Sequence, residues 1–191
     1  MNAAGVILSA GASRRMGTPK ALLLYEGETF LDRIARLFLE HCGPVVVVLG
    51  HHASRIVQEV RCSRKVIFAH NSDPDRGMLT SLQCGLATLP PETRRALFTP
   101  VDLPAILPST IPRLLAEPAD VVAPAWMGRR GHPVCISPAV IAAILALPPE
   151  AQARDAIRRF AAQTVEVDDP GVVNDIDDPA AYRRLLESAA P

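Results

Sequence analysis

Short, uniformly apolar runs alternate with amphipathic stretches along the chain, and this alternation limits the folds that the chain can adopt. The run Val45–Leu49 follows a proline and is β-branched almost throughout, which is typical of a central parallel strand covered on both faces. The stretch 29–40 instead places apolar residues such as Phe30 and Ile34 on one face at helical spacing. Strands that alternate with helices predict a three-layer, Rossmann-like α/β fold with a mostly parallel sheet.

The remaining elements follow the same pattern, and prolines mark most of their boundaries. From Gly128 onward we expect a hairpin-like excursion, then two helices, a last strand and a closing helix. With 191 residues, no repeat and no linker, the chain predicts one domain over residues 1–191. The other predicted strands are 5–9, 65–69, 95–99, 120–123 and 163–167, and the other predicted helices are 54–60, 79–89, 109–115 and 179–186.

The charges and cysteines exclude several classes of protein. Twenty Lys and Arg balance twenty Asp and Glu, so the net charge does not attract nucleic acid or anionic lipid. The longest apolar runs are far shorter than the ~20 residues that span a bilayer. The four cysteines include no CxxC pair, which disfavours a structural zinc site and favours free thiols in a reducing compartment. We therefore expect a cytoplasmic protein with neither nucleic acid nor a membrane as partner.

The first predicted strand runs into a loop rich in small and basic residues, Leu8-Ser9-Ala10-Gly11-Ala12-Ser13-Arg14-Arg15-Met16-Gly17-Thr18-Pro19-Lys20. Ligands of parallel α/β sheets bind beyond the carboxyl ends of the strands. Small residues let backbone N–H groups approach an anion there, and Arg15 and Lys20 add positive charge. The spacing is neither a Walker A motif nor GxGxxG. On residue types alone, an anion-binding loop and an exposed basic turn are equally open.

The same run resembles the LxAGxSxRMGxxK signature of the nucleotidyltransferases related to the molybdenum-cofactor cytidylyl- and guanylyltransferases. The resemblance implies a nucleotide-diphospho-sugar transferase-like fold in which this signature loop wraps a nucleoside triphosphate. Lys20 would lie against the phosphates, and Arg15 and Lys20 would stabilise the negative charge that develops on the phosphates during transfer. Ser9-Ala10-Gly11 is closer to the Ala-Ala-Gly of cytidylyl enzymes than to the Gly-Gly of guanylyl enzymes, which implies CTP rather than GTP. The implied nucleotide-binding residues of the loop are Ala10, Gly11, Ser13 and Gly17.

Asp102 follows the strand predicted at residues 95–99. A carboxylate at a strand end faces the ligand crevice and is able to hold Mg²⁺, although an aspartate near a proline is more often a turn or cap residue. The segment Thr99-Pro100-Val101-Asp102-Leu103-Pro104 resembles the family's TPxDxP motif, which implies that Asp102 is a metal ligand and acts in the reaction. Nucleotidyl transfer needs a cation because charge on the α-phosphate and on the leaving pyrophosphate must be neutralised.

Two further segments resemble family motifs. Gly77 and Ser81 stand near the start of the helix predicted at 79–89, where the resemblance places the nucleotide base. The alternative is an ordinary helix start. The run Gly131-His132-Pro133-Val134 resembles the family's GHPV, which implies that His132 and the nearby Arg130 bind the acceptor. A hydrogen-bonded turn histidine and a solvated hairpin tip are the alternatives.

The last segment, Asn174-Asp175-Ile176-Asp177-Asp178-Pro179, resembles the family's NDIDTP run. Asp177 or Asp178 is suited to cap the closing helix, which explains one carboxylate but not the cluster. By resemblance, Asn174 or Asp175 supplies a second metal ligand opposite Asp102. Both segments follow predicted strand ends, so we expect an oxygen of Asn174, Asp175 or Asp177 within ~4–6 Å of the Asp102 carboxylate, sharing one Mg²⁺.

Together these segments imply a Mg²⁺-dependent nucleotidyltransferase. It would move CMP, or another nucleoside monophosphate, from the triphosphate to a phosphorylated acceptor such as molybdopterin and release pyrophosphate. A GTP-using guanylyltransferase and a sugar- or polyol-phosphate nucleotidyltransferase are the alternatives within this class. A nucleotide- or cofactor-binding module without turnover is the alternative from another class. The molybdoenzyme that receives the cofactor, or its chaperone, is the implied protein partner.

Overall fold

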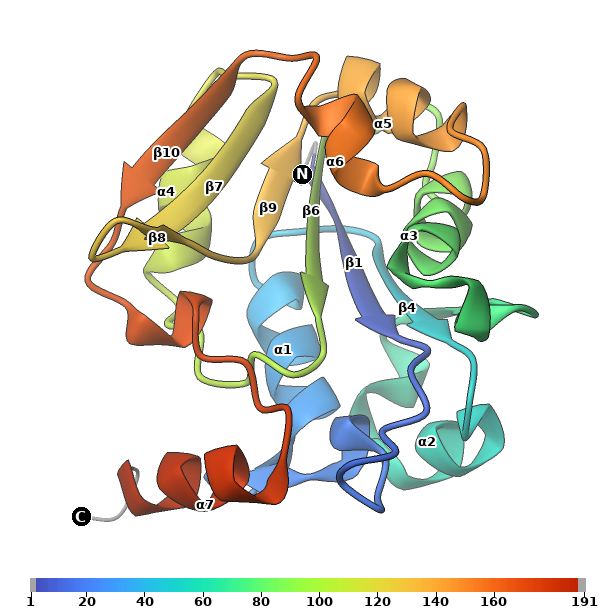
Figure 1. Ribbon diagram of the computed structural model, residues 1–191, viewed down its shortest axis with the longest axis vertical. Helices are drawn as coiled ribbons and strands as arrows, with labels where there is room; N and C mark the ends of the chain where they lie inside the picture. The colour runs from blue at the N-terminus through green and yellow to red at the C-terminus, as the bar shows by residue number, and fades with distance from the viewer. Residues whose placement is uncertain (1–2, 189–191) are drawn as a thin grey trace.

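An eight-stranded sheet forms the middle layer of residues 3–188, the part of the chain that the computed structural model describes. Its strands lie in the order β10-β7-β9-β6-β1-β4-β5, and β8 pairs with the end of β7. β9 is antiparallel to both neighbours, and the other pairs along this path are parallel. The strands are β1 (Ala3–Ser9), β4 (Val45–Leu49), β5 (Ile67–His70), β6 (Arg95–Pro100), β7 (Val121–Trp126), β8 (Arg129–Arg130), β9 (Val134–Ile136) and β10 (Ala162–Glu166), with a separate hairpin of β2 (Leu24–Tyr25) and β3 (Glu28–Thr29) (Figure 1).

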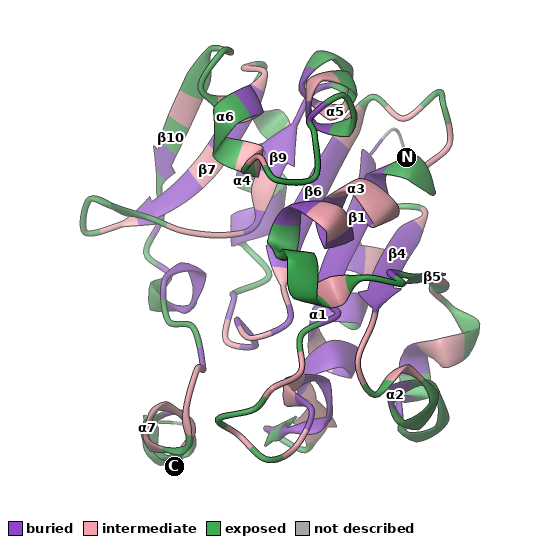
Figure 2. Cartoon of the chain, turned by 45° about the vertical axis from the view of Figure 1, so that its right-hand side comes forward, coloured by how far each residue is buried: buried purple, intermediate pink, exposed green. Residues whose placement is uncertain are grey.

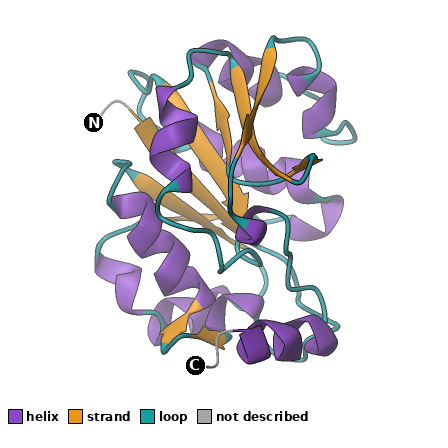
Figure 3. Cartoon of the chain, turned by 90° about the vertical axis from the view of Figure 1, so that its left-hand side faces the viewer, coloured by secondary structure: helices purple, strands orange, loops and turns teal. Residues whose placement is uncertain are grey.

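Helices cover both faces of the sheet, as Figure 3 shows. One apolar core takes side chains from α1, α2 and α4, and the other takes side chains from α3, α5 and α6. The predicted three-layer, mostly parallel α/β fold is therefore confirmed. No helix among residues 3–188 is long and apolar enough to cross a membrane. The helices are α1 (Phe30–Leu39), α2 (Ala53–Glu59), α3 (Met78–Ala87), α4 (Thr110–Ala116), α5 (Pro138–Leu145), α6 (Ala153–Ile157) and α7 (Pro179–Ser188), with single 3₁₀ turns η1 (Lys20–Leu22), η2 (Arg61–Arg64), η3 (Pro74–Arg76) and η4 (Pro170–Val172).

The valine run forms β4, whose side chains alternate between the two cores. Val45, Val47 and Leu49 join the core on the α1 side, while Val46 and Val48 join the core on the α3 side. All five are at most 3% exposed (Figure 2), and burying each such side chain contributes roughly 1.5–3 kcal/mol. As predicted, β4 is an internal parallel strand, paired with β1 on one side and with the edge strand β5 on the other. Its uniform apolar character comes from the helices on both faces.

The chain after β7 departs most from the prediction. β7 continues past the predicted end at residue 123 to Trp126, and Met127 and Gly128, both at positive φ, turn the chain back into β8. β9 then inserts antiparallel between β6 and β7. The predicted hairpin-like excursion is therefore partly a strand of the main sheet. The two helices, last strand and closing helix expected after it are present as α5, α6, β10 and α7.

Residues 167–178, here called the C-terminal crossing, carry the chain from the β10 edge back to the middle of the sheet. Asp169 is 1% exposed, and its carboxylate accepts hydrogen bonds from the Leu107 backbone N–H and the Thr110 hydroxyl. Further along, the backbone N–H of Ile176 donates to the carbonyl oxygen of Asp102 at 2.8 Å. These contacts place the C-terminal crossing beside the residues that follow β6.

A glycine in the β8–β9 connection lets the C-terminal crossing approach the sheet. A Cβ atom at Gly131 would lie 1.9 Å from the carbonyl oxygen of Val172. The same carbonyl accepts a hydrogen bond from the backbone N–H of His132 at 2.9 Å. Only a residue without a side chain fits between these two segments, so the position of the crossing depends on glycine at 131.

Candidate active site

The signature loop between β1 and η1 is held by its own turns. Ser13 and Gly17 adopt left-handed backbone conformations, with φ of 50° and 66°. The Ser13 hydroxyl accepts a hydrogen bond from the Lys20 backbone N–H at 3.0 Å. The carbonyl of Ala10, which is buried, accepts from the His51 backbone N–H after β4. The loop therefore presents the Lys20 side chain from a backbone that is fixed at both ends.

The Lys20 side chain lies at the centre of the site. Its ammonium nitrogen Nζ donates to Asp102 Oδ2 at 2.8 Å and to Asp177 Oδ1 at 2.6 Å. The Lys20 and Asp102 side chains are 14% and 19% exposed, so water screens their ion pair less than it screens a surface pair. Burial disfavours the charged ammonium, but the hydrogen bonds to the two carboxylates outweigh it and raise the pKa of Lys20 above its ordinary value.

Arg15 binds the other oxygen of Asp177, with 3.0 Å between Nη2 and Oδ2. The hydrogen bond from Lys20, with a smaller contribution from Arg15, lowers the pKa of Asp177 below its ordinary value. Asp178 instead caps α7, because its Oδ1 accepts from the Ala181 backbone N–H at 2.8 Å. Of the two carboxylates that were candidates for the helix cap, Asp178 takes that place and Asp177 faces the signature loop.

The predicted approach of the two segments is present for Asp177. Asp102 Oδ2 and Asp177 Oδ1 are no more than about 5.4 Å apart, the sum of their 2.8 and 2.6 Å distances to Lys20 Nζ. The physical reason differs from the expected one, because β10 lies at the far edge of the sheet, separated from β6 by β7 and β9. It is the C-terminal crossing, bonded through Ile176 to the Asp102 carbonyl, that brings the two carboxylates together.

The other two candidate ligands lie differently. Asp175 is exposed and lines a cavity together with Asp102 and His132. Asn174 lines a neighbouring cavity, against α7, that does not include Asp102. Among the three residues considered for a second metal ligand, Asp177 is therefore the one joined to Asp102 through a common hydrogen-bond donor.

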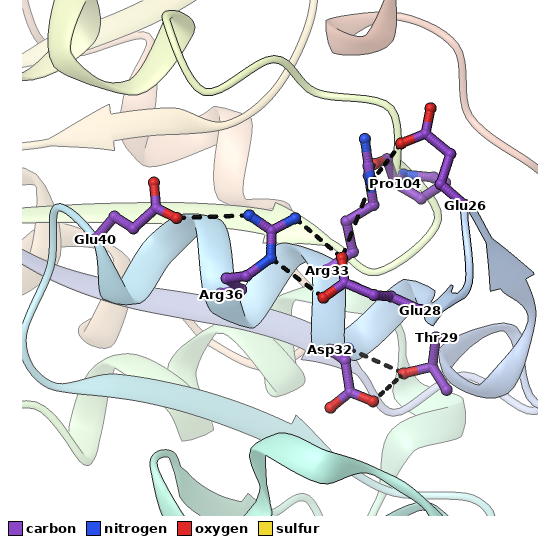
Figure 4. Close-up of polar contacts among 8 residues, drawn as sticks. All are labelled: Glu26, Glu28, Thr29, Asp32, Arg33, Arg36, Glu40 and Pro104. Carbon is purple, nitrogen blue, oxygen red and sulfur yellow. Dashed lines mark hydrogen bonds and ion pairs between the residues drawn. The ribbon is translucent and has the colours of Figure 1, made fainter. Parts of the chain in front are cut away.

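The loop that carries Asp102 is anchored on two sides. The Val101 backbone N–H donates to the carbonyl of Leu8 at the end of β1, at 3.0 Å. Arg33 on α1 donates through Nε to the Pro104 carbonyl at 2.8 Å, and its Nη1 pairs with Glu26 at 2.7 Å (Figure 4). Asp102 is thus fixed between β1 and α1.

Two cavities meet at Asp102. The first, of about 240 Å³, is lined by the signature loop, including Gly11, Arg15 and Lys20, and by both carboxylates. The second, of about 330 Å³, is lined by β8, the β8–β9 connection and the C-terminal crossing, with His132 among its walls. The ends of β1 and β6 point toward this region, and the chain before α7 passes beyond them (Figure 1). Asp102 is common to both cavities.

His132 and Arg130 belong to the second cavity. The imidazole of His132 packs edge-on against Phe98, with ring centroids 6.0 Å apart. Burial lowers the pKa of His132, and the carboxylates of Asp102 and Asp175 oppose that shift only in part. Arg130 is exposed, and its Nε donates to the Thr164 hydroxyl at 2.9 Å. The cavity therefore combines a neutral imidazole with guanidinium groups.

Ser81 and Gly77 mark the start of α3. Gly77 precedes the helix with φ of 110°, a conformation that favours glycine. The Ser81 hydroxyl is buried and accepts from Asn71 Nδ2 at 2.9 Å, and the same nitrogen donates to Thr80. Asn71 was missed in the sequence analysis, although its place directly after β5 was the available signal. Ser81 is thus joined to the end of β5, and its contact with a nucleotide base stays a prediction.

The carboxylate pair suits a hard divalent cation. Mg²⁺ and Mn²⁺ prefer oxygen ligands, and two Mg–O bonds of ~2.1 Å span at most ~4.2 Å, which lies within the upper limit of about 5.4 Å on the separation of the pair. Residues 3–188 hold no group of three or more His, Cys, Asp or Glu that suits a metal ion. A cation bound to Asp102 and Asp177 would therefore complete its shell with substrate or water oxygens.

Comparison with known proteins places the chain among nucleotidyltransferases. Residues 5–167 match the model of the MobA-like NTP transferase domain, a segment that contains Lys20 and Asp102 but not Asp177. The chain is 25% identical over 175 residues to the molybdenum cofactor cytidylyltransferase of Escherichia coli, covering 91% of this chain and 90% of that protein. It is 28% identical over 132 residues to the molybdenum cofactor guanylyltransferase of Sinorhizobium fredii, covering 68% of this chain and 60% of that protein.

Solved structures share the fold of this chain. The crystal structure of Rv0371c from Mycobacterium tuberculosis matches with a TM-score of 0.85 at 27% identity and covers 97% of each chain. A crystal structure of Rv0371c in complex with manganese matches with a TM-score of 0.80 at 25% identity, covering 98% of this chain and 100% of that one. Sequence and structure comparisons therefore agree over nearly the whole chain.

Proposed function

Because this chain belongs to the family of MobA-like NTP transferase domains, we propose that it transfers CMP from CTP to a phosphate oxygen of molybdopterin and releases pyrophosphate. Nucleotidyl transfer itself follows from the family and from its molybdenum-cofactor relatives. The observation that carries the finer proposal is that Asp102 lines both cavities. A carboxylate at such a junction is suited to the place where a phosphate donor and a phosphate acceptor react.

The first cavity is the proposed site of the triphosphate. Gly11 leaves the backbone accessible there, since no atom lies within 4 Å of the position that its Cβ would take. Arg15 and Lys20 supply positive charge along the same wall. These groups bind the phosphates and stabilise the charge that passes to pyrophosphate as the bond to the α-phosphate breaks.

The second cavity is the proposed site of the acceptor. The guanidinium groups of Arg129 and Arg130 attract an acceptor phosphate, and guanidinium geometry matches phosphate oxygens. His132, held neutral by burial, is suited to orient that phosphate through a hydrogen bond. An oxygen of the acceptor phosphate attacks the α-phosphate across Asp102, and pyrophosphate leaves on the signature-loop side. No covalent enzyme intermediate is needed.

Mg²⁺ is the proposed cofactor, held by Asp102 and Asp177. When bound it neutralises charge on the α-phosphate and the leaving pyrophosphate. The donor set supports this choice because both groups are hard carboxylates. The manganese complex of Rv0371c, a structural relative, supports a divalent cation in this fold. Arg15 orients Asp177 for this role by binding its outer oxygen.

CTP is the proposed donor. Two observations support it: the Ser9-Ala10-Gly11 run lacks the double glycine of guanylyl enzymes, and the cytidylyltransferase relative is matched over 91% of this chain. A thermal-shift screen of the four nucleoside triphosphates with Mg²⁺ tests it. CTP at 100 times its Kd should stabilise the fold by ~2.7 kcal/mol. A larger shift with GTP than with CTP would instead favour a guanylyltransferase, as the Sinorhizobium relative is.

Pyrophosphate release tests turnover itself. Purified protein, CTP, Mg²⁺ and molybdopterin should release pyrophosphate, whereas omission of molybdopterin should abolish release. Replacement of molybdopterin by a sugar phosphate or polyol phosphate tests the other acceptor class. Faster release with such a phosphate than with molybdopterin would move the acceptor assignment to that class.

A further inference from the structure

The Lys20 ammonium occupies the place between the two carboxylates that face each other across the site. Its Nζ lies 2.8 Å from Asp102 Oδ2 and 2.6 Å from Asp177 Oδ1. These are the oxygens that the proposed function assigns to a divalent cation. The Lys20 ammonium and the divalent ion therefore cannot occupy this position together. We propose that Lys20 is the resident cation of this site in the nucleotide-free protein and competes with the divalent ion until a triphosphate draws its ammonium away.

The charges of the cluster favour this exchange. Lys20 and Arg15 balance Asp102 and Asp177 one for one. A divalent ion added alone meets the Lys20 ammonium at short range and leaves the cluster positive, which is unfavourable beside the mostly buried side chains of Lys20 and Asp102. A triphosphate brings more negative charge than the ion brings positive charge. The ion and the triphosphate should therefore bind more tightly together than separately.

The Lys20 side chain has room to make the exchange. Its backbone is fixed by the bond from its N–H to the Ser13 hydroxyl and by η1. Its four-carbon stem is flexible, and it borders the 240 Å³ cavity together with Gly11 and Arg15. Rotation of the side chain alone moves the ammonium from the carboxylates into the proposed triphosphate site. This step rests on the proposed function, because it takes that cavity as the nucleotide site.

Binding of Mn²⁺ alone, with no nucleotide present, tests the competition. Electron paramagnetic resonance counts free Mn²⁺ as the full chain is titrated. Lys20→Met should bind Mn²⁺ at least about tenfold more tightly than the wild type, within the range of coupled sites. Lys65→Met is the matched control, since Lys65 is the chain's other lysine and is exposed, and its affinity should equal that of the wild type. Unchanged or weaker binding by Lys20→Met would overturn the proposal.

Two further variants separate occupancy from general charge. Arg15→Gln removes a positive charge from Asp177 but frees no space between the carboxylates, so its gain in Mn²⁺ affinity should be much smaller. An equal gain in Arg15→Gln and Lys20→Met would contradict direct competition. Adding Asp102→Asn to Lys20→Met should abolish the gain. If Lys20→Met melts at a lower temperature than the wild type, Lys20→Gln repeats the test with a polar side chain.

A second experiment observes the Lys20 ammonium group directly while nucleotide is added. Because the chain has two lysines, ¹⁵N spectra of the side-chain ammonium groups contain two lysine signals. CTP with Mg²⁺ should shift the Lys20 signal and leave that of Lys65 in place. A Lys20 signal that stays unchanged while CTP binds would overturn the proposal. If CTP binds neither wild type nor variants, the proposed function fails, but the Mn²⁺ titration still decides whether Lys20 occupies the cation site.

Discussion

The two sides of the site are built in different ways. The signature-loop side comes from one continuous stretch after β1, whose turns hold Lys20 through local bonds such as Ser13 to Lys20. The acceptor side combines β8, the β8–β9 connection and the C-terminal crossing, which meet only because Gly131 and Asp169 allow and anchor their contact. The first side can be recognised from consecutive residues, whereas the second exists only in the folded sheet.

Asp102 and Asp177 lie where the two sides meet. Asp102 belongs to both cavities, and Asp177 reaches from the C-terminal crossing to the signature loop through Lys20 and Arg15. If this arrangement is correct, loss of Asp102, which both cavities share, should cost more turnover than loss of a group on one side. Loss of an anchor of the crossing should cost stability as well.

Asp102→Asn should lower turnover by about 10³-fold, because it removes charge at the point common to both cavities. The fold should persist, since the Asp102 carbonyl still accepts from Ile176 and its neighbour Val101 still donates to Leu8. Steady-state pyrophosphate release measures the effect, with a thermal melt as control. Turnover within a few-fold of wild type would remove Asp102 from the reacting centre.

Lys20→Ala should lower turnover by at least ~10²-fold, the loss of one charged contact in the transition state. The variant should keep its fold because the Lys20 side chain, at the start of η1, lies outside the apolar cores. The same kinetic assay applies, with Lys65→Ala as the matched control. Full activity of Lys20→Ala would instead favour the interpretation of the signature loop as an exposed basic turn.

Asp169→Ala should destabilise the fold by about 2–4 kcal/mol, because it leaves the part-buried N–H of Leu107 and the buried hydroxyl of Thr110 without their acceptor. Asp168→Ala is the control, since Asp168 is the adjacent exposed aspartate and should change stability by less than ~0.5 kcal/mol. Urea unfolding measures both. Equal stabilities for the two variants would show that the crossing is not anchored at Asp169.

The buried thiol of Cys42 makes the stability of the apolar core depend on alkaline pH. Burial raises the pKa of this thiol to about 12 from about 9. A folded-state pKa above the unfolded value gives stability that is complete below pH 9 and is lost as pH rises toward 12, about 1.4 kcal/mol by pH 10. Urea unfolding at pH 8 and pH 10 should therefore show a smaller loss for Cys42→Ala than for wild type. Equal losses would contradict the assigned pKa.

Most of the fold could be predicted because the signals are local. The strand at Val45–Leu49 has the bounds expected from its valines, and the other parallel strands follow from apolar runs set between helices. The antiparallel insertion of β9 could not be predicted, because three residues, Val134–Ile136, carry no information on strand direction or neighbours. The position of β10 at the far edge likewise depends on contacts distant in sequence.

The site likewise contains residues that local sequence predicts and residues whose position depends on contacts distant in sequence. Lys20 and Asp102 were identified from consecutive motifs, whereas the choice among Asn174, Asp175 and Asp177 was not. The Ile176 backbone bond and the Asp178 cap hold the segment on either side of Asp177, whose carboxylate contacts Lys20. Asp169 gave no signal in the sequence, because its partners at 107 and 110 lie about sixty residues away. The roles of these residues toward substrates stay predictions.

The most direct test of the account follows the α-phosphate of CTP in wild type and Asp177→Asn. With α-³²P-labelled CTP, molybdopterin and Mg²⁺, the wild type should place one label on the acceptor for each pyrophosphate released. Asp177→Asn should transfer label at least ~10²-fold more slowly, with a melting temperature close to that of the wild type. Full-rate transfer by Asp177→Asn, or pyrophosphate release without label on the acceptor, would contradict a reacting centre shared by the two sides.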